Sequence, residues 1–307
     1  MKDSVGRRAI SQLLGVVAAS ALIWACTSAR SDSSRSSDLT APPSPAAALV
    51  PFTPTIDCGG GASCQLTMDV TMPAQGGQRS LILLVPGGPQ PLEEEKALLV
   101  STLGPALAQR GAVVMTIQWR QGPTYGAAFP ADLADVACAI GVARSVGPSY
   151  GADPSKLTLV GHSLGAWAGA VLVLTQEEYT PADGACARTA GALRPDRFVS
   201  VAGALDPKQK DDISIGDQLG VDPARLAAAD PFALIEQYPA AKGPLPITLI
   251  HGTADSVVPP EVSRRFRAAA NAQGYAVPLV EVPDADHHDV LVSPRTIDTI
   301  ASVATSA

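Results

Sequence analysis

One serine of this chain stands in a pattern that would make its hydroxyl a nucleophile. Ser163 is the central residue of a Gly-x-Ser-x-Gly sequence at residues 161–165. An apolar run at residues 157–160 precedes this sequence and an alanine-rich stretch follows it, which predicts a strand, a sharp turn and a helix. Such a turn exposes the serine hydroxyl, and its glycines lack the Cβ atoms that would collide there. The alternative interpretation is a structural serine in a glycine-rich loop.

A serine nucleophile needs a base, and the base needs a carboxylate that orients it. Asp255 lies in a loop directly after an apolar run, and Asp206 occupies a similar position earlier in the chain. His287 and His288 are the candidate bases, because both follow the last predicted strand. Adjacent histidine side chains diverge, so we expect no metal site there. We therefore expect a serine, a carboxylate and a histidine to meet, with Asp206 and His288 as the alternatives.

Short apolar runs alternate with helical patterns along the chain. The candidate strands are residues 66–70, 81–85, 112–117, 157–160, 198–202, 247–250 and 278–282, and the candidate helices are residues 93–110, 132–146, 166–174 and 261–272. This alternation predicts an α/β protein with a mainly parallel, doubly wound sheet and helices on both faces. Residues 206–246 break the alternation, and we expect them to form a small cap-like insertion after the sixth strand.

From about residue 75 to residue 300 the chain resembles the α/β-hydrolase superfamily, most nearly its carboxylesterase and dienelactone-hydrolase-like members. The resemblance rests on the serine turn, on residues 129–135, on residues 150–154, and on residues 247–259. It implies the α/β-hydrolase fold and assigns Asp255 as the acid. It also assigns His287 as the base, because His287 takes the place of the histidine in the family's His-Phe-Asp motif. His251 would then be a structural hydrogen-bonding residue.

The resemblance also implies a hole that binds the oxyanion formed during catalysis. One donor would be the backbone N–H of Leu164, and the other would come from Gly87 and Gly88, where the family commonly has His-Gly-Gly. Pro86 stands in place of that histidine, so a side-chain hydrogen bond that orders the loop is missing.

Aromatic residues are scarce in this chain, and four of the large ones fall near the predicted mouth of the site. These residues are Trp119, Tyr125, Phe129 and Trp167. We expect them to line an apolar pocket for the substrate, although core packing would explain any one of them equally well.

The first 25 residues have the pattern of a signal peptide. A basic start is followed by an apolar run at residues 13–25, which is shorter than the roughly 20 residues of a membrane-spanning helix. Residues 23–26 resemble the lipobox of bacterial lipoproteins, which implies cleavage before Cys26 and a lipid on its sulfur. The protein would then be exported and anchored to the cell membrane by this lipid, or secreted if Cys26 is not modified.

The residues behind this signal divide into a tether and a domain. Residues 26–51 are rich in Ser, Ala and Pro, which predicts a disordered tether, and residues 52–307 have the size of one α/β-hydrolase domain.

Four cysteines remain if Cys26 carries lipid. Outside the cytosol an even number suggests disulfides, and Cys58–Cys64 with Cys138–Cys186 is the preferred pairing among three possible connectivities.

The net charge of −7, without a cluster of Lys and Arg, argues against binding to nucleic acid. We therefore predict a serine hydrolase of small-molecule carboxylic esters that needs no cofactor, and we make no prediction of its oligomeric state. The alternatives are an amide or peptide hydrolase that uses the same triad, and a non-catalytic envelope lipoprotein that keeps the fold.

Overall fold

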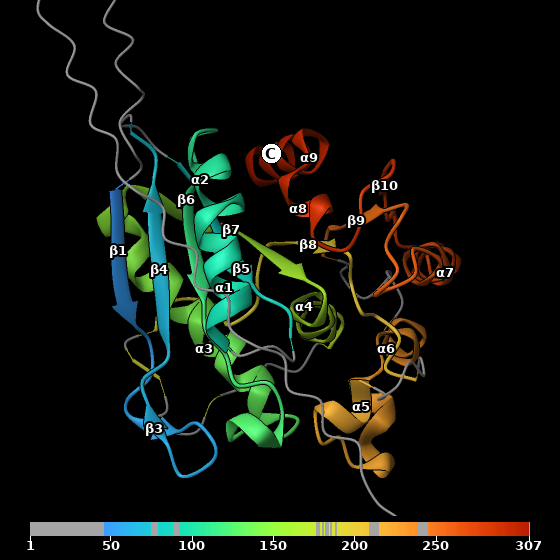
Figure 1. The fold of residues 1–307 in the computed structure, drawn as a ribbon, viewed down its shortest axis with the longest axis horizontal. Helices are drawn as coiled ribbons and strands as arrows, with labels where there is room; N and C mark the ends of the chain where they lie inside the picture. Colours follow the sequence, from blue (N-terminus) through green and yellow to red (C-terminus); the bar gives the residue numbers. More distant parts are fainter. Residues whose placement is uncertain are drawn as a thin grey trace, which may run out of the picture. The chain divides into compact units, whose positions relative to one another are not determined.

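An eight-stranded sheet forms the centre of the computed structural model (Figure 1), with strands in the order β1-β4-β6-β5-β7-β8-β9-β10. The structure describes residues 46–74, 79–88, 92–175, 189–208, 215–238 and 245–306, together with residues 179, 181, 184, 186 and 187. The strands are β1 Ala46–Pro51, β4 Thr67–Met72, β5 Arg79–Val85, β6 Val113–Ile117, β7 Ala152–His162, β8 Arg197–Val201, β9 Ile247–Gly252 and β10 Leu279–Val282. Strand β4 pairs antiparallel with both of its neighbours, β1 and β6. The six strands β5 to β10 are parallel to one another.

Helices cover both faces of this sheet. They are α1 Leu92–Ser101, α2 Leu103–Ala108, α3 Ala131–Val146, α4 Leu164–Leu174, α5 Ile215–Gln218, α6 Pro231–Gln237, α7 Glu261–Ala272, α8 Asp289–Val292 and α9 Pro294–Thr305. Successive strand residues point to opposite faces. Leu83 of β5 therefore belongs to a buried cluster shared with α3, α4 and α7. Its neighbour Leu84 belongs to a cluster shared with α1, α2 and α9. The predicted doubly wound α/β-hydrolase fold is confirmed.

Two elements at the start of the domain differ from the sequence-based expectation. Strand β1 begins at Ala46, within the predicted tether, and pairs antiparallel with β4 from Ala46 opposite Met72 to Pro51 opposite Thr67. The strand predicted at residues 66–70 corresponds to β4, and β1 lies between it and the edge of the sheet. A proline in β1 is tolerated because edge strands have a side without ladder hydrogen bonds.

The helix predicted at residues 93–110 is instead two helices. The chain breaks at Thr102, whose φ of −122° and ψ of −80° are not helical. Pro105 has no N–H to donate to a carbonyl one turn earlier, which accounts for an interruption at this point.

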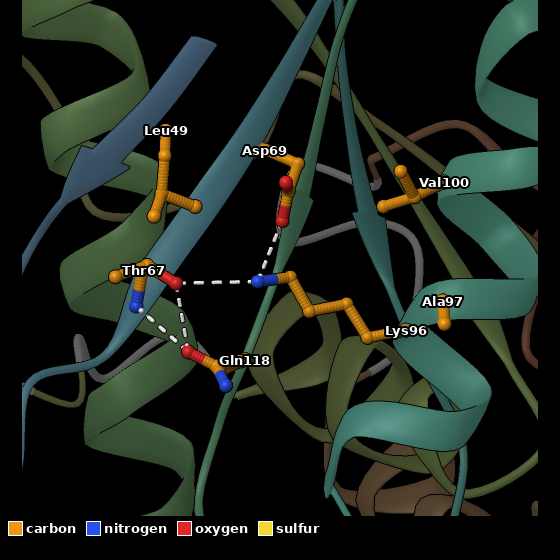
Figure 2. A pocket seen from close by; sticks show the side chains of 7 residues that line it. All are labelled: Leu49, Thr67, Asp69, Lys96, Ala97, Val100 and Gln118. Carbon is orange, nitrogen blue, oxygen red and sulfur yellow. Dashed lines mark hydrogen bonds and ion pairs between the residues drawn. The ribbon is translucent and has the colours of Figure 1, made fainter. Parts of the chain in front are cut away.

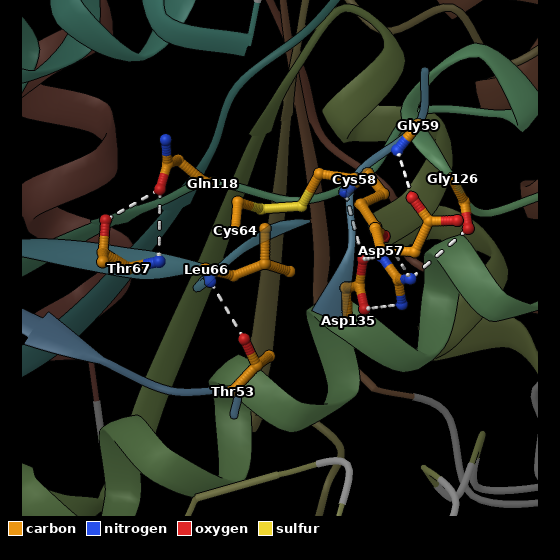
Figure 3. Close-up of a disulfide and its surroundings, with 11 residues drawn as sticks. Thr53, Asp57, Cys58, Gly59, Cys64, Leu66, Thr67, Gln118, Gly126 and Asp135 are labelled. Carbon is orange, nitrogen blue, oxygen red and sulfur yellow. Dashed lines mark hydrogen bonds and ion pairs between the residues drawn. A yellow bond between two sulfur atoms is a disulfide. The ribbon is translucent and has the colours of Figure 1, made fainter. Parts of the chain in front are cut away.

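Both predicted disulfides are present. Cys58–Cys64 closes a short loop (Figure 3) next to the small sheet of β2 Ile56–Asp57 and β3 Ser63–Cys64. Cys138, within α3, pairs with Cys186. The pairing is the one that the sequence analysis prefers.

The chain between β8 and β9 contains α5, a 3-10 helix at Pro223–Ala229, and α6. Asp230 accepts a hydrogen bond from the N–H of Phe232 at 3.0 Å and so caps α6. The indole N–H of Trp167 donates to the carbonyl oxygen of Ala229 at 2.7 Å, which joins this segment to α4.

The predicted signal peptide, Cys26 and the tether up to residue 45 lie outside the described residues. Within the part of the chain that the structure describes, no helix is both long enough and apolar enough to cross a lipid bilayer.

Candidate active site

Ser163 occupies a sharp turn between strand β7 and helix α4. Its φ of 52° and ψ of −118° lie in a region that residues with a Cβ seldom adopt. Two glycines make this turn possible. A Cβ on Gly161 would lie 2.6 Å from the Cα of Ala166, and a Cβ on Gly165 would lie 2.6 Å from the carbonyl oxygen of Pro86. The turn therefore needs glycine at both positions, and it holds the serine in a strained backbone conformation.

Asp255 and His287 come together from the ends of two neighbouring parallel strands. Asp255 follows β9, His287 follows β10, and the Nδ1 atom of His287 lies 2.7 Å from Oδ2 of Asp255. The other carboxylate oxygen accepts hydrogen bonds from the N–H groups of Val257 and Val258, both at 2.9 Å. Burial opposes ionisation of Asp255, but hydrogen bonds from His251 and His287 outweigh it and lower the pKa of the carboxyl group. Asp255 is thus a charged partner for His287.

The ring of His287 is buried beside this carboxylate. Burial lowers the pKa of His287, and charge on the neighbouring histidines lowers it further, while the hydrogen bond to Asp255 opposes the shift. An imidazole with a lowered pKa stays neutral near pH 7 and is able to accept a proton.

The two alternative triad residues have other partners. The side chain of His288 is 56% exposed, and its Nε2 lies 3.6 Å from Oε2 of Glu95. Asp206 forms an ion pair with Arg265 at 2.9 Å. The structure therefore brings together Asp255 and His287, rather than Asp206 or His288.

His251 has the structural position that the resemblance implies. It is fully buried, its Nδ1 contacts the hydroxyl of Ser263 at 2.7 Å, and its Nε2 lies 2.9 Å from the carbonyl oxygen of Val258. These contacts hold the loop that carries Asp255 against α7, because Ser263 belongs to that helix.

The loop of the predicted oxyanion hole lies directly against the serine. A Cβ on Gly87 would be 2.7 Å from the Cβ of Ser163 and 3.3 Å from its Oγ. Gly88 packs against the side chain of Gln121, which would collide with a Cβ at that position. Leu164 is the first residue of α4, where backbone N–H groups have no partner within the helix. Gly87 therefore contacts Ser163, and Leu164 follows Ser163 directly in the chain.

Two residues that sequence reasoning did not assign to this loop hold it in place. The side-chain amide of Gln121 donates to the carbonyl oxygen of Gly87 at 2.7 Å. The indole N–H of Trp119 donates to the carbonyl oxygen of Pro86 at 3.0 Å. Gln121 follows no motif in the sequence, so only its position after β6 could have suggested the contact.

The expectation that Trp119 and Trp167 line a substrate pocket is wrong. Both rings have an exposed fraction of 0% and are packed into the core. Each indole N–H is bonded to a backbone carbonyl, so these tryptophans brace the loop and the insertion instead. Tyr125 is partly buried, and Phe129 is buried beneath Arg225, whose guanidinium lies 5.1 Å from the ring centre.

A cavity of about 350 Å³ lies elsewhere, beside strands β1 and β4 and helix α1 (Figure 2). It is lined by Leu49, Thr67, Asp69, Lys96, Ala97, Val100 and Gln118. Its charged groups are paired with each other, because Lys96 Nζ lies 2.6 Å from Asp69 Oδ2 and 3.2 Å from Thr67 Oγ1. None of the predicted catalytic residues lines this cavity.

Metal-ligating side chains do not gather in the described part of the chain. There, no group of three or more His, Cys, Asp or Glu residues is arranged to hold a metal ion.

Comparison with known proteins gives a family match and several relatives. A family model described as BD-FAE matches residues 68–269. Among curated proteins, Esterase LipQ of Mycobacterium tuberculosis is 24% identical over 223 residues, covering 70% of this chain and 51% of that protein. Esterase LipC of the same organism is 26% identical over 238 residues, covering 73% of this chain and 57% of that protein. The chain thus spans about half the length of the curated relatives it matches.

Solved structures with a similar fold are also found. A butyrate-bound esterase from the Planctomycetes species Thermogutta terrifontis superposes with a TM-score of 0.61 at 23% identity, over 80% of this chain and 91% of that chain. A truncated carbohydrate esterase from gut microbiota superposes with a TM-score of 0.64 at 19% identity, over 86% of this chain and 98% of that chain. Thermogutta terrifontis esterase 2 phosphoramylated by tabun has a TM-score of 0.63 at 22% identity, over 84% of this chain and 92% of that chain. At these identities, the likeness concerns the fold.

Proposed function

Since the chain belongs to the BD-FAE family, we propose that it is a serine hydrolase that cleaves carboxylic esters of small molecules. The observation that carries this proposal is the buried hydrogen bond between Asp255 and His287, and the strained turn that holds Ser163 against Gly87 supports it. Relatives and structural neighbours that are described as esterases support the ester as substrate.

The proposed first step is attack of Ser163 Oγ on the carbonyl carbon of the ester. Because Nδ1 of His287 is bonded to Asp255, the other ring nitrogen, Nε2, is the one that takes the serine proton. Ionised Asp255 stabilises the imidazolium that results. The negative charge on the carbonyl oxygen is bound by the backbone N–H groups of Leu164 and Gly88, with Gly87 beside them.

The second half of the reaction repeats these roles with water. The tetrahedral intermediate collapses, His287 returns its proton to the leaving alcohol, and an acyl group remains on Ser163. His287 then takes a proton from a water molecule that attacks this acyl group, and it returns the proton to Ser163 Oγ as the bond to the acyl group breaks and the carboxylic acid leaves. Each step uses only side chains and backbone groups of this chain, so the proposed reaction needs no metal or cofactor.

A fluorophosphonate probe tests this function, since it reacts with activated serines. The unaltered protein should be labelled and should hydrolyse p-nitrophenyl esters, whereas Ser163→Ala should do neither. Ser302→Ala, at an exposed position of α9, is the matched control and should behave as the unaltered protein does. Comparison of matched p-nitrophenyl esters and anilides separates an esterase from an amidase. A folded protein that neither reacts with the probe nor turns over an ester would contradict the proposal and favour a non-catalytic lipoprotein.

We also propose that the protein is exported and held at the cell membrane by a lipid on Cys26. The basic and apolar pattern of residues 1–25 and the lipobox-like residues 23–26 support this. Cys26→Ser should release the protein from the membrane fraction and abolish incorporation of labelled fatty acid. Equal membrane association of both forms would contradict the lipid anchor.

A further inference from the structure

A second carboxylate–imidazole pair lies behind the candidate triad. His162 is the last residue of β7 and immediately precedes Ser163. Its side chain is only 2% exposed, and its Nδ1 is bonded to Oε1 of Glu95, a buried residue of α1. Neither residue belongs to the candidate triad or to the predicted oxyanion hole, and the proposed mechanism does not use them.

The other nitrogen of His162 reaches the catalytic histidine itself. Nε2 of His162 lies 2.9 Å from the backbone carbonyl oxygen of His287. The two imidazole rings are also in contact, with their centres 4.7 Å apart and their planes inclined at 45°. His162 therefore touches both the backbone and the ring of His287.

The two hydrogen-bond partners of His162 are a carbonyl oxygen and a carboxyl group. A carbonyl oxygen only accepts, so Nε2 of His162 must carry a proton. Burial would raise the pKa of Glu95, but its hydrogen bond to His162 and the charge of that ring outweigh burial and lower the pKa. Glu95 is then a carboxylate, which also only accepts, so both ring nitrogens of His162 face acceptors.

We propose that His162, held by Glu95, is a positioning residue that fixes the backbone of His287 and places a positive charge beside its ring. This inference rests on the proposed function, in which His287 is the base. His162 and Ser163 are adjacent in the chain. The hydrogen bond from His162 to the carbonyl oxygen of His287 therefore fixes the loop that carries His287 relative to the turn at Ser163. The positive charge disfavours a second positive charge on His287, so the base stays neutral to lower pH than it otherwise would.

Other charged groups around His287 act together with this pair. Asp255, from the loop after β9, bonds the opposite side of the ring and favours its protonation. His288 lies on the same loop, with its ring centre 5.3 Å from that of His287 and 5.7 Å from that of His162. Asp286 accepts hydrogen bonds from the N–H groups of His288 and Asp289, at 2.8 and 2.7 Å, and closes the turn. His162 thus offsets part of the negative charge of Asp255.

The test is the pH dependence of kcat/KM for ester hydrolysis in four variants. His162→Gln keeps an amide N–H able to donate to the His287 carbonyl but removes the charge, so the acid limb should move to higher pH by about one unit. Glu95→Gln leaves a neutral His162, because an amide N–H can donate to Nδ1, and the acid limb should move in the same direction by less.

His162→Ala removes both contacts, so kcat should fall about tenfold or more with KM within about twofold of the original. Glu94→Gln is the matched control, since its side chain is exposed on the same helix, and it should leave the profile unchanged.

A purely structural role predicts a different result. In that case His162→Gln and Glu95→Gln would lower the melting temperature or the activity without moving the acid limb, and the proposal would be overturned. If His162→Gln does not fold, the acid limb of the kcat/KM profile of Glu95→Gln is compared with that of the unaltered protein instead, with the same two outcomes. Failure of the proposed function is distinguishable, because the unaltered protein would then show no fluorophosphonate labelling and no ester turnover at any pH.

Discussion

The side-chain amide of Gln121 donates a hydrogen bond to the carbonyl oxygen of Gly87, 2.7 Å away. Gln121 is 4% exposed and fills the space in which a side chain at residue 88 would lie. The relatives that the chain resembles commonly carry a histidine where this chain has Pro86, and Gln121 holds the loop from the opposite side. We infer that this contact keeps the N–H of Gly88 directed at the position of the oxyanion.

Gln121→Ala should therefore slow the chemical step. Removal of a direct oxyanion donor lowers kcat about 10²- to 10³-fold in serine hydrolases, and loss of a residue that only positions the donor should cost less, about tenfold. KM should change little, because the substrate gains this contact mainly in the transition state. Gln118→Ala is the control, since Gln118 bonds Thr67 of β4. Equal kcat values for the two variants in p-nitrophenyl ester hydrolysis would count against this role of Gln121.

Asp255→Asn should lower kcat by about 10³- to 10⁴-fold. The amide would no longer stabilise an imidazolium on His287, and its N–H group would favour the wrong tautomer of the ring. Asp206→Asn provides the comparison, because Asp206 pairs with exposed Arg265 rather than with a histidine, and its kcat should stay within about twofold. Steady-state kinetics at pH 7–8 measure both values. A large loss in Asp206→Asn with little loss in Asp255→Asn would reverse the assignment of the acid.

The parts of this site that could be predicted are those written in consecutive residues. The turn at Ser163 follows from two glycines and an apolar strand, and Asp255 follows the end of another apolar strand. Parallel strands bring such ends to one edge of a sheet. The strands were also predictable, because residues buried on both faces form continuous apolar runs.

The parts that could not be predicted depend on contacts between distant residues. Glu95 and His162 are separated by 67 residues, and Gln121 and Gly87 by 34, so no local pattern records either pair. The scarcity of aromatic residues favours a pocket for the two tryptophans, but burial is decided by tertiary packing. Trp167 is fully buried in α4, where its indole N–H donates to the carbonyl oxygen of Ala229.

Comparison of Ser163→Gly with Ser163→Ala should reveal the strain in the turn. Both variants lack the nucleophile and should be inactive. Alanine keeps a Cβ at a φ of 52° and a ψ of −118°, whereas glycine adopts such angles without steric cost. The glycine variant should therefore be the more stable of the two by about 1 kcal/mol, after subtraction of its larger unfolded-state entropy. Urea unfolding monitored by tryptophan fluorescence measures the difference, and an alanine variant at least as stable as the glycine variant would argue against stored strain.

Asp132 should make the stability of the fold depend on pH. Its side chain is fully buried at the start of α3, and within the described structure its Oδ2 atom has no hydrogen-bond partner. Burial raises the pKa of Asp132 to about 8 from an ordinary value of 3.8. Between these pH values the folded protein holds a proton that the unfolded chain releases, so the stabilising effect is complete below about pH 4 and is lost as the pH rises through 8.

Asp132→Asn should remove this dependence, because an amide of the same shape does not ionise. The variant should have nearly the stability of the unaltered protein at about pH 4 and should exceed it increasingly toward pH 8, by an amount on the order of 4 kcal/mol at pH 7. Thermal and urea unfolding at pH 5, 7 and 8 measure the difference. Asp298→Asn, at an exposed ion pair with Arg110, is the control and should change stability by about 1 kcal/mol or less. A difference between Asp132→Asn and the unaltered protein that is constant with pH would mean that Asp132 is ionised in the folded state.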